Sequence, residues 1–257
     1  MDDFQNYCQF SQDFTIRPHE VDAKHYWLPR FMMWTLQEAA VNHVTHLKMG
    51  YNDLIKDNLA WALAGFKVKI NKMPMWNEDI RVRTWGKSST KLFIFREFEV
   101  TSKEYDYPLI VATSNWFIMD LNTRRPIRIE PYAGVVHNEE FLDYPLKKSL
   151  LPDPLSFNGS DLSSTKKVCF EDLDHNFHAN NVHYIRWMFD SLKDDFKMEH
   201  ILKDFEIYFV HELSCGDQIE SMAYELQEEG GKTFFHLLTH PQGGYSAMAK
   251  SVWQSRK

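Results

Sequence analysis

The chain has 257 residues, of which 44% are hydrophobic and 25% are charged, and this globular composition excludes disorder as the main state. Its net charge of -7 argues against a nucleic-acid-binding protein, because such proteins neutralise phosphates with a basic face. No run of about 18 apolar residues occurs, and the acidic N-terminus lacks a secretory pattern. We therefore expect a cytoplasmic protein without membrane insertion.

The first half of the chain has the pattern of one helix followed by strands. Apolar residues recur every three or four positions over residues 29–49, which predicts an amphipathic helix with Gly50 just past its end. Residues 66–70 and 80–84 then alternate between apolar and polar, and strand-like runs follow at 91–100 and 109–119. The sequence predicts a helix and an antiparallel sheet.

The second half repeats this order of elements. A helix is predicted to start near Asn180 and to continue through residues 182–196, and strands are predicted at 205–209, 219–226, 232–238 and 247–253. An offset of 139 aligns Phe66 with Phe205 and Ile80 with Ile219, which suggests an internal duplication. The alternative is that any two helix-then-sheet segments align by apolar periodicity. Residues 120–167 contain five prolines and are typical of a linker.

A cluster of polar residues comes directly before the second helix. Asp174, Asn176 and His178 stand two apart, so in an extended segment they project to one side, near a helix N-terminus that favours developing negative charge. The alternative is a loop whose Asp and Asn residues cap the helix and form Asx turns. Glu212 lies near the end of an apolar strand, and the offset places it opposite Met73 in the first half. Alternatively, Glu212 is a solvated edge residue.

Metals, cofactors and disulfides are not expected. Cys8, Cys169 and Cys215 are far apart and form no C-x-x-C pair, and the alternation of Cys169 with apolar neighbours predicts a packed strand residue. His175 and His178 have no obvious third ligand. Neither a P-loop nor a dinucleotide fingerprint is present.

The segment DLDHNFHANNVHYIRWMFDSL resembles the D-x-N-x-H-x-N-N-x-x-Y signature of acyl-acyl carrier protein thioesterases. The segments FKVKINKMPMWNEDIRVRTW and SNWFIMDLNTRRPIRI are also similar to that family, so the resemblance covers most of residues 14–253. It implies an α+β fold of two hot-dog domains in tandem, each a long helix wrapped by a curved antiparallel sheet, with the acyl chain bound in a tunnel. We expect an N-terminal hot-dog domain with the substrate tunnel at 1–135, a linker at 136–165 and a C-terminal hot-dog domain with the catalytic residues at 166–257.

The resemblance also implies the chemistry. The family's catalytic Asp, Asn, His and Glu fall on Asp174, Asn176, His178 and Glu212. Plant relatives place a Cys directly after the Glu, whereas Leu213 follows here, so we expect water rather than a thiol to attack the thioester. The expected reaction is hydrolysis of fatty acyl-acyl carrier protein without a cofactor, with Glu212 or Asp174 taking the proton. A hot-dog hydratase or dehydratase acting on 3-hydroxyacyl thioesters and a non-catalytic acyl-binding module are the alternatives.

The expected partner, acyl carrier protein, is acidic, so a chain of net charge -7 needs a local basic surface to bind it. The densest basic candidates are Arg124, Arg125, Arg128, Lys147 and Lys148. The alternative is that these are linker charges that serve solubility. The tandem halves can pair within one chain, which leaves a homodimer of such chains open.

Overall fold

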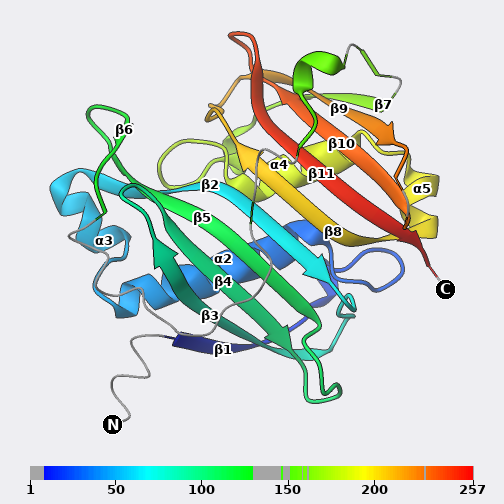
Figure 1. Ribbon diagram of the computed structural model, residues 1–257, viewed down its shortest axis with the longest axis horizontal. Coiled ribbons are helices and arrows are strands. Elements are labelled where there is room, and N and C mark those ends of the chain that lie inside the picture. The colour runs from blue at the N-terminus through cyan, green and yellow to red at the C-terminus, as the bar shows by residue number, and fades with distance from the viewer. Residues whose placement is uncertain are drawn as a thin grey trace. The chain divides into compact units, whose positions relative to one another are not determined.

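The computed structural model describes residues 9–129, 146, 151–157, 159–160, 162–228 and 230–256. Its contacts divide the chain into two units, Met1–Trp27 with Met32–Leu146, and Leu28–Phe31 with Lys147–Lys257 (Figure 1). Most of the predicted linker, 136–165, lies outside the described residues. Within the described ranges, no helix has both the length and the apolar content that a membrane span requires.

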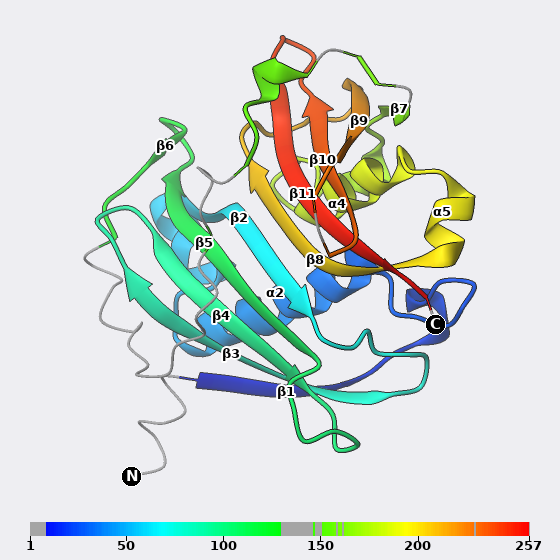
Figure 2. The same ribbon diagram turned by 45° about the vertical axis from the view of Figure 1, so that its right-hand side comes forward.

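Unit 1 is an antiparallel sheet with a long helix on one face. The strands are β1 (Gln9–Thr15), β2 (Leu59–Ile70), β3 (Asp79–Ser89), β4 (Ile94–Thr101) and β5 (Ile110–Asp120), in the order β1-β3-β4-β5-β2, and β6 (Arg125–Pro126) pairs with β5. The helix α2 (Pro29–His46) runs along this sheet, as Figures 1 and 2 show, and the short α3 (Tyr51–Leu54) follows it. The predicted apolar stripe of α2 is buried at Leu36, Ala39, Ala40 and His43. Burial of this stripe forms the core of the unit.

Unit 2 has the same architecture with a shorter helix. Its strands are β7 (Leu162–Lys167), β8 (His200–Phe209), β9 (Gln218–Leu226), β10 (Lys232–Thr239) and β11 (Tyr245–Ser255), in the order β8-β11-β10-β9-β7. The helix α4 (Asn181–Asp190) packs on β7, β9 and β10, and α5 (Asp194–Glu199) packs on β8. Phe189 of α4 makes edge contacts with Phe205 and Trp253, which anchors the helix on the sheet. Both units are therefore α+β.

The topology supports the internal duplication. Reading β1, β3, β4, β5 and β2 as β7, β9, β10, β11 and β8 gives the same strand order in both units. The offset of 139 places β2 and β3 on β8 and β9 to within two residues at each end. The identical order of strand pairing adds support that periodicity alone could not give.

The predicted helix boundaries need two corrections. The first helix ends before Gly50, because Lys48 takes the left-handed conformation with φ 60. Gly50 itself has φ -73, and a Cβ at this position would lie 2.7 Å from Thr45 Oγ1, so glycine is needed here for close approach. The second helix is broken after Asp190, where Ser191 Oγ donates to Met188 O at 2.6 Å, and α5 begins only at Asp194.

Three strands were not predicted: the two-residue β6 and the edge strands β1 and β7. β1 contains five polar residues and lies at the edge beside β3, so it lacks the apolar run that identifies a central strand. β7 reads LSSTKK and forms an edge of the unit 2 sheet, although all six of its residues lie in the stretch 120–167 whose composition was typical of a linker. Edge strands bury less apolar surface, so their sequences contain fewer apolar residues and lack the pattern that predicts a strand.

Candidate active site

The loop before α4 is closed on itself by Asp174. Leu173 and Ala179 form an antiparallel bridge, and the Asp174 N–H donates to His178 O at 2.7 Å. Asp174 Oδ1 accepts the backbone N–H groups of Asn176 at 2.8 Å and of His178 at 3.3 Å. Phe177, at the tip, has φ 63. The Asx turn that the alternative interpretation expected is therefore present, and it determines the conformation of the loop.

The alternation along this loop agrees with the prediction that three side chains share one side. Asp174, Asn176 and His178 are half-buried, whereas His175 and Phe177 between them are exposed. Asn180 starts the helix, because its Oδ1 accepts the Val182 N–H at 3.1 Å. Capping and Asx-turn formation thus fall on Asn180 and Asp174, and they leave the side chains of Asn176 and His178 for another role.

His178 and Glu212 are brought together. Glu212 lies in the β8–β9 loop, three residues beyond the last residue of β8, and is thus near the end of the strand as predicted. The N–H of Ala179 donates to Leu213 O at 2.8 Å and ties the two loops together. His178 Nε2 lies 3.4 Å from Glu212 Oε2, and the two side chains are 27% and 44% exposed. A carboxylate and an imidazole therefore meet at a surface that a substrate can reach.

The side-chain amide of Asn176 is available for a ligand. Within the described ranges it has no hydrogen-bond partner, because only its backbone N–H is used. An amide N–H beside a carboxylate and an imidazole can donate to a carbonyl oxygen and stabilise an oxyanion.

Tyr184 is a further residue of the site to which sequence reasoning assigned no role. Its side chain is 2% exposed, and its hydroxyl donates to His211 O at 3.3 Å, directly before Glu212. Burial raises the pKa of Tyr184, so the hydroxyl stays protonated as a donor at neutral pH. The signal was present in the sequence, because Tyr184 is the final residue of the D-x-N-x-H-x-N-N-x-x-Y pattern. Tyr184 positions the loop that carries Glu212.

Metal ligands are not grouped at this site. His175 is exposed, and no set of three His, Cys, Asp or Glu side chains that could hold a metal ion occurs in the part of the chain that the structure describes.

The thiols do not adjoin the Glu212 carboxylate in sequence. Cys215 lies three residues after Glu212 and is exposed, and Cys8 lies outside the described residues. Cys169 is exposed as well, and its Sγ donates to Lys167 O at 3.4 Å. The prediction that Cys169 packs in a strand is wrong, because it directly precedes the turn η6 (Phe170–Asp172).

Unit 1 contains a second copy of the Asp174 loop. Val21 and Trp27 form the equivalent bridge, and His25 takes φ 67 as Phe177 takes φ 63. Asp22 Oδ1 accepts the N–H groups of Lys24 at 2.8 Å and of Tyr26 at 3.0 Å. These residues stand 152 positions before their counterparts, rather than 139, because the segment between loop and strand is longer in unit 1.

The two copies differ in their chemistry. The positions of Asn176, His178 and Glu212 are taken in unit 1 by Lys24, Tyr26 and Met73. Asp22, which corresponds to Asp174, makes the same pair of backbone hydrogen bonds in a loop that lacks the other three side chains. The aspartate therefore serves the fold of the loop wherever the loop occurs.

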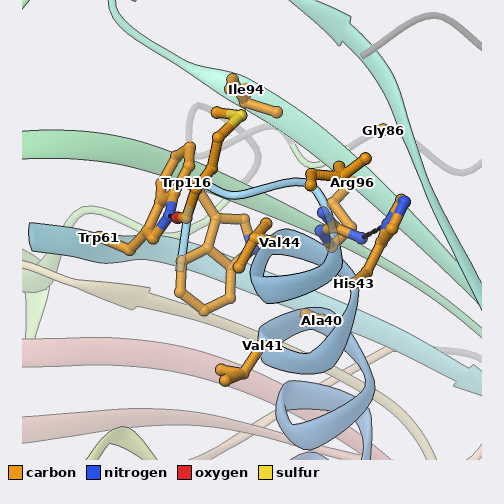
Figure 3. Close-up of a pocket in the computed structure, with 11 residues that line it drawn as sticks. Ala40, Val41, His43, Val44, Trp61, Gly86, Ile94, Arg96 and Trp116 are labelled. Carbon is orange, nitrogen blue, oxygen red and sulfur yellow. Dashed lines mark hydrogen bonds between the residues drawn. The ribbon is translucent and has the colours of Figure 1, made fainter. Parts of the chain in front are cut away.

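Unit 1 has a pocket between α2 and the sheet (Figure 3). It is lined by Ala40, Val41, His43, Val44, Leu47, Met49, Trp61, Gly86, Ile94, Arg96 and Trp116. Most of these side chains are apolar. The lining therefore suits contacts with apolar groups.

Three of the five predicted partner-binding residues are described. Arg124, Arg125 and Arg128 are exposed at and beside β6, which pairs with the end of β5 (Figure 1). Lys147 and Lys148 lie outside the described residues.

Two helix-and-sheet units of the same topology, of which unit 2 carries Asn176, His178 and Glu212, define a tandem hot-dog protein. Family models identify it further: the acyl-ACP thioesterase N-terminal domain matches residues 8–133 and the C-terminal domain matches residues 158–255. The chain belongs to the acyl-ACP thioesterase family.

Known proteins agree with this assignment. A palmitoyl-acyl carrier protein thioesterase of Cuphea hookeriana is 26% identical over 259 residues, which are 96% of this chain and 62% of that protein. One of Gossypium hirsutum is 30% identical over 226 residues, 83% of this chain and 54% of that protein. The chain thus spans less than two thirds of the length of these relatives.

Solved structures confirm the α+β tandem hot-dog fold. An acyl-ACP thioesterase from Bacteroides thetaiotaomicron superimposes with a TM-score of 0.81 at 22% identity, over 98% of this chain and 99% of that one. A 12:0-ACP thioesterase from Umbellularia californica gives a TM-score of 0.83 at 22% identity, over 96% and 98%.

Proposed function

We propose that this chain hydrolyses the thioester of fatty acyl-acyl carrier protein and releases a free fatty acid and the carrier's thiol. The observation that carries the proposal is the contact of His178 Nε2 with Glu212 Oε2 at 3.4 Å, with the unused amide of Asn176 in the same loop as His178. Membership of the family and the names of the relatives support the same substrate class.

Each of these three side chains has a role in the proposed reaction. Glu212 takes a proton from water, and the water oxygen forms a bond to the thioester carbonyl carbon. The Asn176 amide donates to the oxyanion that develops on the carbonyl oxygen. When the intermediate collapses, the carbon–sulfur bond breaks, and the proton held by Glu212 passes through His178 to the departing thiolate. Atoms and charge balance without a covalent enzyme intermediate.

Asp174 acts as a positioning residue in this proposal. Its Oδ1 is engaged by two backbone N–H groups, and Asp22 performs the same task in a loop without the other groups. Of the two carboxylates that the sequence left open, we assign the base to Glu212.

We further propose a division of labour along the chain. The N-terminal domain, 1–135, supplies the acyl pocket of Figure 3, the C-terminal domain, 166–257, supplies the reacting groups, and 136–165 links them. The exposed Arg124, Arg125 and Arg128, with Lys147 and Lys148, are the proposed carrier-binding surface. A cytoplasmic location stays a prediction from the sequence, and a homodimer stays open to test.

Product analysis tests the proposed function against the alternatives. The protein is incubated with palmitoyl-acyl carrier protein and, separately, with a matching enoyl thioester, while thiol is followed with a thiol-reactive dye and products by mass spectrometry. A thioesterase releases palmitate and one thiol per acyl group. A hydratase instead adds water to the enoyl thioester without releasing thiol, and a binding module leaves both substrates intact; either result would contradict the proposal.

A further inference from the structure

A buried arginine stands at one end of the pocket in unit 1. Arg96 of β4 is 6% exposed and lines the pocket together with His43 of α2 (Figure 3). Its Nη1 lies 3.0 Å from His43 Nδ1 and 3.1 Å from Thr84 Oγ1. Because a guanidinium has only donors, His43 Nδ1 accepts, and the imidazole proton sits on Nε2. Both partners of Arg96 are therefore neutral.

The charge of Arg96 has no anion in the described part of the chain. None of the ion pairs involves Arg96, and its neighbour Glu97 pairs instead with Lys87 at 2.6 Å. Burial lowers the pKa of Arg96 to about 10, which still leaves the guanidinium charged at neutral pH. Burying a charge without a counter-ion costs free energy, and a ligand atom that accepts a hydrogen bond from Arg96 would offset part of that cost.

Apart from Arg96 and His43, the polar side-chain groups of the described lining residues are already paired. The indole N–H of Trp61 donates to Met49 O at 2.8 Å, and that of Trp116 donates to Ser114 Oγ at 2.7 Å. Nε and Nη2 of Arg96 donate to no group among the described residues. A plain alkyl chain that fills this space excludes water from the guanidinium and has no acceptor that could replace the lost hydrogen bonds. A chain with an oxygen at this depth accepts a charge-assisted hydrogen bond.

We infer that the pocket selects acyl chains that carry a hydroxyl or carbonyl oxygen along the hydrocarbon, with that oxygen bound by Arg96. The inference rests on the proposed function, in that it takes the pocket to be the acyl site. The rest of the acyl chain then packs against the apolar lining and the two indoles. Arg96 is thereby a specificity-determining residue.

Binding measurements without chemistry test this inference. Non-hydrolysable amide analogues of acyl-pantetheine are prepared with one chain length, either unsubstituted or hydroxylated near the carbonyl, in mid-chain or at the terminal carbon. Calorimetry compares them on the wild type, on Arg96→Met and on the control Arg81→Met, an exposed arginine of β3 that does not line the pocket. We expect at least one hydroxylated analogue to bind the wild type and the control about 10-fold more tightly than the plain chain. Arg96→Met should lose this preference.

Two results would overturn the inference: a plain chain that binds the wild type as tightly as every hydroxylated one, or a preference that survives in Arg96→Met. The wild-type comparison decides even when Arg96→Met does not fold. Turnover of acyl-acyl carrier protein is measured separately. If the hydroxyl preference is present without thiol release, the proposed function fails and the pocket inference stands. If thiol is released without the preference, the pocket inference fails and the proposed function stands.

Discussion

Replacing Asp174 separates a positioning carboxylate from a catalytic base. In the structure Asp174 Oδ1 accepts the N–H groups of Asn176 and His178, so Asp174→Ala leaves both donors without this acceptor. Asp174→Asn keeps an oxygen at the same place and loses only the charge. If the carboxylate serves the loop, the two substitutions should differ strongly; if it removes a proton from water, they should be equally damaging.

The size of the effect follows from the two hydrogen bonds. A hydrogen bond to a charged group contributes about 1.5–3 kcal/mol and a neutral one about 1 kcal/mol. The His178 bond, at 3.3 Å, is long, and Asp174 is half-buried, so both values fall at the lower end. Asp174→Ala should therefore destabilise the loop by roughly 3 kcal/mol and Asp174→Asn by roughly 1 kcal/mol. Because an ångström-scale displacement of reacting groups costs about 10²-fold in rate, we expect kcat to fall about 10²-fold for Ala and less than about 10-fold for Asn.

Unit 1 supplies a matched control. Asp22 makes the same two bonds, at 2.8 Å and 3.0 Å, in a loop without Asn176, His178 or Glu212 counterparts. Asp22→Ala should lower the free energy of unfolding by a similar amount, measured by urea denaturation, and leave kcat within about threefold. Thiol release from palmitoyl-acyl carrier protein measures kcat. An Asp174→Asn protein that is folded and as inactive as Asp174→Ala would refute this reasoning and make Asp174 the base.

Three further outcomes are expected. Arg124→Glu with Arg125→Glu should raise KM for acyl-carrier substrates and weaken its salt dependence while rates with a short acyl-pantetheine hardly change; an unchanged KM in steady-state kinetics would place carrier binding elsewhere. Cys215→Ser should keep most of the activity, and intact-mass spectrometry of quenched reactions should show no acyl adduct, whereas an adduct on Cys215 would replace water attack by thiolate attack. Burial lowers the pKa of His236 from 6.5 to about 3, so stability should be lost as pH falls below 6.5, because only the unfolded chain then binds the proton. Urea unfolding should show a loss of about 2 kcal/mol from this group between pH 6.5 and 5 that is absent in His236→Gln, and equal slopes in both proteins would contradict it.

Much of the fold was readable from periodicity. The stripe of α2 and the alternation in β2 and β3 record burial on one face, and burial is what a sequence pattern reports best. Ends of elements were less predictable, because they depend on single conformations such as the positive φ of Lys48. Edge strands such as β1 do not show this pattern, because they contain few apolar residues that alternate with polar ones.

The candidate site shows a similar limit. The two-residue spacing of Asp174, Asn176 and His178 indicates a shared side, and the structure agrees. The role of Asp174 could not be separated from that of Glu212, since both are carboxylates and only hydrogen-bond geometry distinguishes them. The copy of the loop at Asp22 was also hidden, because a single offset of 139 does not align loops that lie 152 residues apart.

The central claim is that Glu212 activates water for hydrolysis of an acyl thioester. Single-turnover rates of fatty acid release from palmitoyl-acyl carrier protein test it most directly. Glu212→Gln is compared against Glu171→Gln, which replaces an exposed carboxylate in η6, directly before the Asp174 loop in sequence. Removing a general base costs about 10²-fold or more, so Glu212→Gln should be slower by at least that factor while Glu171→Gln matches the wild type. A folded Glu212→Gln protein that releases palmitate at the wild-type rate would contradict the account.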